Sequence, residues 1–263
     1  MDFTDYKFSC HNISKIMAYK NKDEVPKGAI THCKNLMKKE MFKRKRLLNT
    51  KEIKKGNYNE QRGYNLYQNV FGSLLVQNET LIENDYQKGT PDNITKSNST
   101  VRDIKNSWDL ETYPMFDDDI PNNDYYWQLQ SYMSLTGCMN AELVYCLTDA
   151  PIRMVDDSLR RLDWDLDLFG AGFESIKPGK ESTVIQVVTN MIYTEKGIKD
   201  YCLHHGWEYE SMFEGFEVIP DEMRIKVFKI SRNDEDIDLM NQRIERCREF
   251  MNSIKFSNKI YLS

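Results

Sequence analysis

The residues that decide the fold form the stretch GTPDNITKSNSTVRDIKNSW, positions 89–108. Its second half, residues 100–107, has the composition of a β-strand. Asp103 and Lys105 are two residues apart on that strand, so both side chains project from one face, while Ile104 points the other way into the core. Asp92 precedes Asp103 by 11 residues, a length that suits a hairpin between adjacent strands. We therefore expect Asp92, Asp103 and Lys105 to lie close together.

Residues 57–71, before this stretch, have the pattern of an amphipathic helix. Glu60, Tyr64, Tyr67 and Phe71 recur at the spacing of one helix face, and the three aromatic rings indicate that this face contacts the core. Glu60 points toward the same interior, close to the start of the helix. We therefore expect its carboxylate to approach Asp92 and Asp103.

The elements after and around this stretch predict the fold class. Residues 124–135 predict a helix that Gly137 ends, and residues 141–147 (AELVYCL) predict a buried strand. Further strands are expected over 72–77, 80–84, 86–92 and 223–230, and further helices over 9–19, 28–47 and from Asp234 onward. The last helix has an apolar stripe that we expect to dock on the sheet of the same chain: Ile237, Met240, Ile244, Cys247 and Met251. This order predicts an α/β (α+β) fold, a small mixed sheet flanked by helices.

Length and composition favour one domain over residues 1–263. Apolar residues make up 40% of the chain, enough to build a core. Within the domain we distinguish a basic helical N-terminal segment (1–56), a catalytic core (57–150) and C-terminal strand and helix additions (151–263). Apolar runs are too short to span a bilayer and the N-terminus is too polar for a signal peptide, so we expect a cytoplasmic protein without a membrane partner. The six cysteines are then expected to be free thiols, several of them buried.

Charge is distributed unevenly along the chain. Residues 1–56 carry 15 Lys and Arg against 6 Asp and Glu, a net charge of +9, whereas the remainder carries 21 against 35, a net charge of −14. The densest basic run is Lys43, Arg44, Lys45 and Arg46. Such a run is either a solvated helix face or a contact for a polyanion, and we interpret it as a candidate DNA-binding arm. Ser107, directly after the strand, is a second candidate contact for a phosphate, or else a turn residue.

Three carboxylates in one place predict a metal site. Glu60, Asp92 and Asp103 would repel one another unless a cation joined them, and a set of oxygen ligands favours Mg²⁺ or Mn²⁺. The backbone carbonyl of Ile104 is a natural further ligand. An ion held there lowers the pKa of water, and Lys105 beside it orients that water or stabilises the charge that develops on a phosphate. The set predicts hydrolysis of phosphodiester bonds in DNA.

These residues resemble the active site of the PD-(D/E)XK nuclease superfamily. More closely, residues 1–150 resemble the YqaJ-type phage recombination exonucleases, relatives of the lambda exonuclease, in the segments KGNYNEQRGYNLY, GTPD, VRDIKNSW, NDYYWQLQSYMSLTG and AELVYCLTDAP. The resemblance implies a restriction-endonuclease-like core, with metal ligation by Glu60, Asp92 and Asp103 and catalysis by Lys105. Gln128 and Tyr132 fit a QxxxY motif, and the resemblance implies that they lie beside the site or the DNA backbone. Asp103 stands where many relatives have a glutamate, and its shorter side chain alters the placement of the metal.

The resemblance also implies an activity and partners. It implies 5′→3′ exonuclease digestion of linear double-stranded DNA from its ends, in phage-type DNA recombination. A single-strand annealing protein and a trimeric ring of identical chains are the implied partners. If the chain is phage-encoded, its location is the cytoplasm of a bacterial host.

Alternative functions and sites are also conceivable from the sequence. A PD-(D/E)XK endonuclease of the restriction or repair type would have the same site with a different path for DNA, and a DNA-binding module without activity is the non-enzymatic alternative. An iron–sulfur nuclease would need four clustered cysteines, which the spacing does not offer. His204 and His205 are adjacent, so on a regular element we expect them to face apart and not to bind a metal. The acidic run 117–119 predicts a solvated loop.

Overall fold

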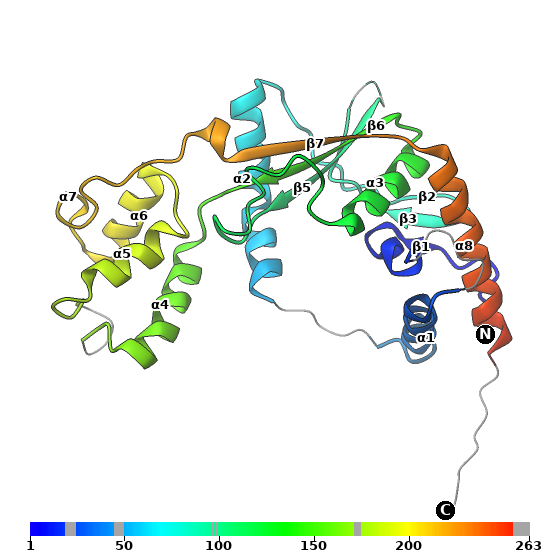
Figure 1. Ribbon diagram of the computed structural model, residues 1–263, viewed down its shortest axis with the longest axis horizontal. Coiled ribbons are helices and arrows are strands. Elements are labelled where there is room, and N and C mark those ends of the chain that lie inside the picture. Colours follow the sequence, from blue (N-terminus) through cyan, green and yellow to red (C-terminus); the bar gives the residue numbers. More distant parts are fainter. Residues whose placement is uncertain (19–24, 45–49, 96, 98, 171–174, 255–263) are drawn as a thin grey trace, which may run out of the picture.

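The main sheet has four strands in the order β4-β5-β6-β7 (Figure 1). The computed structural model describes residues 1–18, 25–44, 50–95, 97, 99–170 and 175–254. β5 (Thr100–Asn106) and β6 (Asn140–Cys146) run parallel at the centre, and each has an antiparallel neighbour at the edge, β4 (Asn93–Ile94) beside β5 and β7 (Ile225–Ser231) beside β6. The sheet is therefore mixed, as the order of elements predicted.

Helix α3 (Asn123–Thr136) makes the crossover that a parallel pair such as β5 and β6 requires. It begins after Asn122, whose side chain accepts a hydrogen bond from the Asp124 amide at 2.8 Å, and it ends at Gly137, which has a φ of 73°. Leu143 and Tyr145 of β6 pack on the same face of the sheet as α3. The predicted helix with its glycine end is thereby confirmed.

Helix α2 (Lys51–Phe71) covers the opposite face, where Val144 of β6 packs against its tyrosines. A Cβ on Gly63 would stand 3.1 Å from Ile104 Cγ2, closer than carbon atoms normally pack, so glycine allows α2 to approach β5 here. Tyr64 and Tyr67 are buried as the stripe predicted. Phe71 is instead 49% exposed, because it lies on the last turn and rests against Tyr67, with ring centroids 4.5 Å apart.

A second core joins the two ends of the chain. It lies between η1 (Cys10–Ile16), α1 (Lys27–Phe42) and α8 (Asp234–Ser253), next to a short sheet in the order β1-β3-β2 (Phe8–Ser9, Gln87–Gly89 and Ile82–Glu83). The apolar stripe of α8 is buried throughout, as predicted. It docks on α1, η1 and α3 rather than on the face of the sheet, because α3 already covers that face.

Helices α4–α7 form a lobe with its own apolar core, at the opposite end of the molecule from α1 and α8 (Figure 1). They are α4 (Ile152–Leu166), α5 (Glu181–Thr189), α6 (Glu195–His205) and the short α7 (Tyr209–Met212), and a single turn, η3 (Asp221–Met223), leads back into β7. The lobe is therefore inserted between β6 and β7, two strands that pair along their whole length. None of the described helices is long and apolar enough to cross a membrane.

Several expected boundaries are corrected. The strand expected over 72–77 is absent: Gly72 ends α2 with a φ of 63°, and Leu74 and Val76 are mostly exposed. Only Ile82–Glu83 of the next expected strand is extended in a ladder, because the segment before it is held by the side chain of Asn78, which bonds to the Pro91 and Thr80 carbonyls. The helix expected over 9–19 is a 3₁₀-helix, and the basic helix ends at Phe42. All six cysteines are free and buried.

Candidate active site

A hollow of about 630 Å³ opens where β5 continues beyond the end of β4. β4 pairs with Val101 and Arg102 only, and Asp92 stands just before it. The Asp92 Oδ2 atom accepts a hydrogen bond from the Ile104 amide at 2.6 Å. Beyond the end of β4, this side chain therefore supplies the acceptor that a strand backbone would otherwise provide. The hairpin thus places Asp92 beside the strand that carries Asp103 and Lys105. Asp92, Ile104, Lys105 and Glu60 all line the hollow.

Asp103 is buried behind this hollow, with only 2% of its surface exposed. Its Oδ2 atom lies 2.6 Å from Lys105 Nζ, and its Oδ1 atom accepts a hydrogen bond from Gln128 Nε2 at 3.1 Å. Gln128 Nε2 also lies 3.0 Å from the Tyr132 hydroxyl. A Cβ on Gly89 would stand 2.9 Å from the Tyr132 ring, so the glycine that opens the GTPD segment lets this ring approach. Gln128 therefore fixes the carboxylate of Asp103 from the α3 side, and Tyr132 in turn holds Gln128.

Lys105 remains a cation in this setting. Burial alone would lower the pKa of its ammonium, but Asp103 and Asp92 outweigh burial and raise that pKa. The ammonium also lies over the ring of Tyr125, 5.3 Å from its centroid. With 28% of its side chain exposed, Lys105 is fixed by Asp103 and Tyr125 while still reaching the hollow.

The surroundings of Asp92 disfavour the charged form of its carboxylate. Burial and the Asp103 carboxylate together raise its pKa to about 7, an increase that Lys105 offsets only in part. The Tyr64 hydroxyl donates to the Asp92 backbone carbonyl at 2.8 Å and holds the chain in place. An additional cation beside Asp92 would remove the penalty.

Glu60 approaches the hollow from α2 without closing on the aspartates. Its side chain is exposed, and Gln77 Nε2 donates to its carboxylate at 2.7 Å. Within the described part of the chain, Glu60, Asp92 and Asp103 do not bring three ligand oxygens within 4.8 Å of one another. The expected meeting of all three at one point is therefore incomplete in this structure, because Gln77 holds Glu60 to one side.

Ser107 lies at the inner wall of the hollow, where β5 ends. Its side chain is 4% exposed, and its hydroxyl has no hydrogen-bond partner among the described residues. Its backbone amide is occupied by the Cys146 carbonyl at 2.9 Å. A buried hydroxyl without a partner is costly, so the hollow offers a donor to a bound oxygen-rich ligand.

Solved structures of two exonucleases have folds similar to this one. A phage-related exonuclease from Haemophilus somnus superposes with a TM-score of 0.66 at 20% identity, covering 94% of each chain. An alkaline exonuclease from Laribacter hongkongensis, also solved in complex with dAMP, gives a TM-score of 0.57 at 12% identity and covers 95% of this chain and 89% of its own. The chain has the fold of these exonucleases. No family model matches the sequence, and no curated protein matches it.

This exonuclease fold confirms the fold that the sequence resemblance implied. Of the four residues in the expected DNA-binding run, two lie among the described residues. Lys43 and Arg44 are exposed directly after α1, and Lys43 Nζ pairs with Glu40 at 3.1 Å. Lys45 and Arg46 lie outside the described residues.

Two residues that support the site, Tyr125 and Gln77, were not predicted from the sequence. Tyr125 stands three residues before Gln128 and seven before Tyr132, a helical spacing that places all three side chains on one face of α3. That spacing was available from the sequence. Gln77, which holds Glu60, lies in an irregular segment, and its position depends on the tertiary path of the chain, which periodicity does not reveal.

Proposed function

We propose that this protein is a metal-dependent nuclease that hydrolyses phosphodiester bonds of double-stranded DNA. The observation that carries the proposal is one hollow, lined by Glu60, Asp92 and the charged Lys105, at the open edge of a sheet. The exonuclease fold supports the same conclusion, because both similar proteins named above are exonucleases. The complex of one of them with dAMP supports a nucleotide as the ligand.

The residues around the hollow suit a hard divalent ion. Asp92 and Asp103 share one ammonium, and burial together with the Asp103 carboxylate raises the pKa of Asp92. Glu60, Asp92, Asp103 and the Ile104 carbonyl would hold Mg²⁺ or Mn²⁺, which prefer such oxygen ligands. When bound, the ion supplies a nucleophilic water at neutral pH and neutralises charge on the phosphate. Gln77 would release Glu60 for this purpose.

The chain's own residues then perform defined tasks. Lys105, held by Asp103 and Tyr125, stabilises negative charge on the phosphate or orients the attacking water. Gln128 and Tyr132 act as positioning residues, because Gln128 bonds to Asp103, Tyr132 bonds to Gln128, and neither lines the hollow. The Ser107 hydroxyl donates to a phosphate oxygen at the inner wall.

The finer activity is proposed from the family resemblance. The proposal is digestion of linear duplexes from their ends in the 5′→3′ direction, in phage-type recombination, with a single-strand annealing protein and a trimeric ring as partners. An endonuclease would cut circular DNA as well, and a binding module would cut neither. End-labelled linear DNA and covalently closed circular DNA therefore separate the three.

The decisive experiment is digestion of these two DNAs with Mg²⁺, with Mn²⁺ and with EDTA. Linear DNA should be degraded with either metal and left intact in EDTA. Asp103→Asn should abolish digestion, whereas Asp238→Asn, which removes an exposed carboxylate on α8, should have no effect. Full activity of Asp103→Asn, or digestion in EDTA, would refute the proposal.

The basic run is proposed to hold the DNA backbone. The charge split of +9 against −14 leaves an acidic body that repels phosphate, so a basic segment must offset it. Replacing Lys43, Arg44, Lys45 and Arg46 with Gln should weaken binding to all sequences and reduce the log–log salt slope by roughly 0.9 for each phosphate that the variant no longer neutralises. An unchanged salt slope, measured by fluorescence anisotropy on labelled duplex, would show that the run is only a solvated surface.

A further inference from the structure

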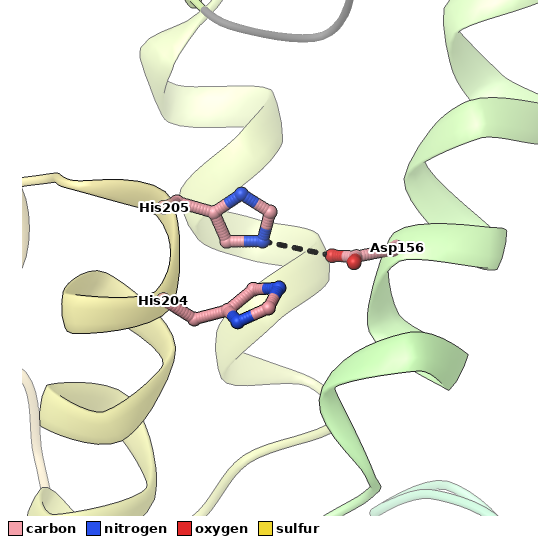
Figure 2. Close-up of side chains that lie close together, drawn as sticks. All are labelled: Asp156, His204 and His205. Carbon is pink, nitrogen blue, oxygen red and sulfur yellow. Dashed lines mark hydrogen bonds and ion pairs between the residues drawn. The ribbon is translucent and has the colours of Figure 1, made fainter.

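Three metal-ligating side chains meet in the helical lobe, away from the hollow (Figure 2). Asp156 projects from α4, and His204 and His205 are the last two residues of α6. One oxygen or nitrogen atom from each lies within 4.8 Å of the others, and this is the one such group of three among the described residues. His205 Nε2 is 3.0 Å from Asp156 Oδ1.

The expectation that adjacent histidines face apart is wrong here. Neighbouring side chains on a helix diverge by about 100°. At the end of α6 the two rings stand perpendicular, with an interplanar angle of 89° and centroids 4.9 Å apart. Both rings reach toward α4, and Asp156 approaches between the two directions (Figure 2). The second helix therefore supplies the carboxylate that the sequence around the histidines lacks.

The donor set favours a borderline transition metal over Mg²⁺. Two imidazoles and one carboxylate are ligands that Zn²⁺ takes in tetrahedral sites, with bonds of about 2.0–2.2 Å. Two ligands on one tetrahedral ion at those bond lengths stand roughly 3.4 Å apart. The separation of 3.0 Å between His205 and Asp156 would need to open by only a few tenths of an ångström. His204 is exposed, so the fourth position would be reached by water.

Two of the three ligands are already held in place. Asp156 is 6% exposed, and its Oδ1 atom also accepts a hydrogen bond from the Tyr201 hydroxyl at 2.9 Å. The ring of His205 is stacked on Trp207 at 4.9 Å and lies against Tyr201 at 4.6 Å. Such supporting contacts fix the orientation of a ligand before a metal arrives. The negative end of the α6 dipole adds to the attraction for a cation.

One positive group opposes this attraction. Arg160 follows Asp156 by one turn of α4, and it also pairs with Asp157 at a distance of 3.8 Å. Asp157 therefore balances part of the Arg160 charge that would oppose a cation at Asp156.

We infer that Asp156, His204 and His205 form a binding site for Zn²⁺ or a similar borderline divalent ion, which ties α4 to α6. The two helices already share the apolar core of the lobe, through residues such as Leu159 and Ile198. The ion would therefore stabilise the lobe, and this role is independent of the nuclease activity proposed above.

The test is Zn²⁺ binding to the full chain in excess Mg²⁺, which competes with Zn²⁺ for sites made of carboxylates alone. Zinc would be titrated by calorimetry after removal of bound metals, with the wild type, His204→Ala and a matched double variant, His11→Ala/His32→Ala. The chain has four histidines, so this control removes the other two. His204 is exposed, so its replacement leaves the fold intact. We expect one tight Zn²⁺ per chain in the wild type and control, and at least tenfold weaker binding in His204→Ala.

Substitution of Co²⁺ for Zn²⁺ identifies the ligands. The visible spectrum should be that of a tetrahedral ion with nitrogen and oxygen ligands. A thiolate charge-transfer band would mean that buried cysteines bind the metal, and would overturn the assignment. Equal affinity in the wild type and His204→Ala, or no tight binding in the wild type, would overturn it as well. In that case the His205–Asp156 contact is only a hydrogen bond within the lobe.

Discussion

Replacing Asp92 with Asn should stabilise the metal-free protein at pH 8. The folded state holds the pKa of Asp92 at about 7, because burial and the Asp103 carboxylate disfavour its charge. In the unfolded chain the pKa of an aspartate is about 3.9. The folded state therefore binds the proton more tightly, and the stability that this provides is complete below pH ~4 and is lost as the pH rises through ~7.

The magnitude follows from the same difference. About three pKa units at 1.36 kcal/mol each correspond to a free energy on the order of 4 kcal/mol between pH 4 and pH 8. Asn is neutral at every pH, and its side-chain oxygen can still accept the hydrogen bond that the Ile104 amide donates to Asp92. For a chain of this size each kcal/mol shifts Tm by about 2–4 °C. The variant should thus melt on the order of 10 °C above the wild type at pH 8.

The assay is thermal unfolding followed by circular dichroism, in EDTA, from pH 4 to pH 8. The wild type should lose stability across this range relative to Asp92→Asn, and Asp238→Asn should follow the wild type. Millimolar Mg²⁺ should restore stability to the wild type and change the variant much less. Equal Tm values for wild type and Asp92→Asn at pH 8 in EDTA would refute the electrostatic account of the site.

Three further predictions concern single residues. Lys105→Ala should lower the cleavage rate on the order of 10²-fold with little loss of metal affinity. The control Lys226→Ala on β7 should leave the rate unchanged. A loss of metal affinity in Lys105→Ala, measured by calorimetry, would contradict the role assigned to Lys105. Gly89→Ala would place a Cβ 2.7 Å from Cys10 Sγ and 2.9 Å from the Tyr132 ring. It should therefore lower the free energy of unfolding by about 1–3 kcal/mol, measured with denaturant, and slow cleavage. Wild-type stability and a wild-type cleavage rate would show that the Tyr132 ring moves aside without cost. Lys55 is fully buried and donates to the Trp108 carbonyl at 2.7 Å, and burial lowers its pKa to about 8. Between pH 8 and pH 10.5 the free energy of unfolding of the wild type should therefore rise by about 3 kcal/mol relative to Lys55→Met, because in this range the unfolded chain binds one more proton than the folded chain. Parallel curves of unfolding free energy against pH for the two proteins would exclude this.

The hairpin and the crossover could be predicted because their signals are local. Asp103 and Lys105 share a face by the two-residue period of a strand, and Gly137 ends α3 by its own conformation. The position of Glu60 could be predicted only in part. Helical periodicity gave its direction, but the amide of Gln77 holds its carboxylate, and that contact depends on how residues 73–81 run across the surface.

The histidine cluster shows why the lobe was not predicted in the same way. Asp156 and His205 are 49 positions apart, and they meet only because α4 and α6 pack around a shared core. A pair of adjacent histidines carries no such information by itself. Sequence patterns predict which face a residue occupies on its own element, and a site built from two elements needs their packing as well.

The topology separates the two sites physically. β6 and β7 pair in register from Asn140 with Ser231 to Cys146 with Ile225, so the two strands between which the lobe is inserted are hydrogen-bonded to each other. The hollow depends on β4, β5 and α2, whereas the histidine cluster depends on α4 and α6. Loss of a metal from the lobe should therefore lower the stability of α4–α7 while β5 keeps Asp103 and Lys105 in place. Amide exchange of the full chain with and without Zn²⁺ would detect this difference: protection should change in α4 and α6 and remain constant in β5 and β6, and a uniform change across the sheet would show that the two sites are coupled.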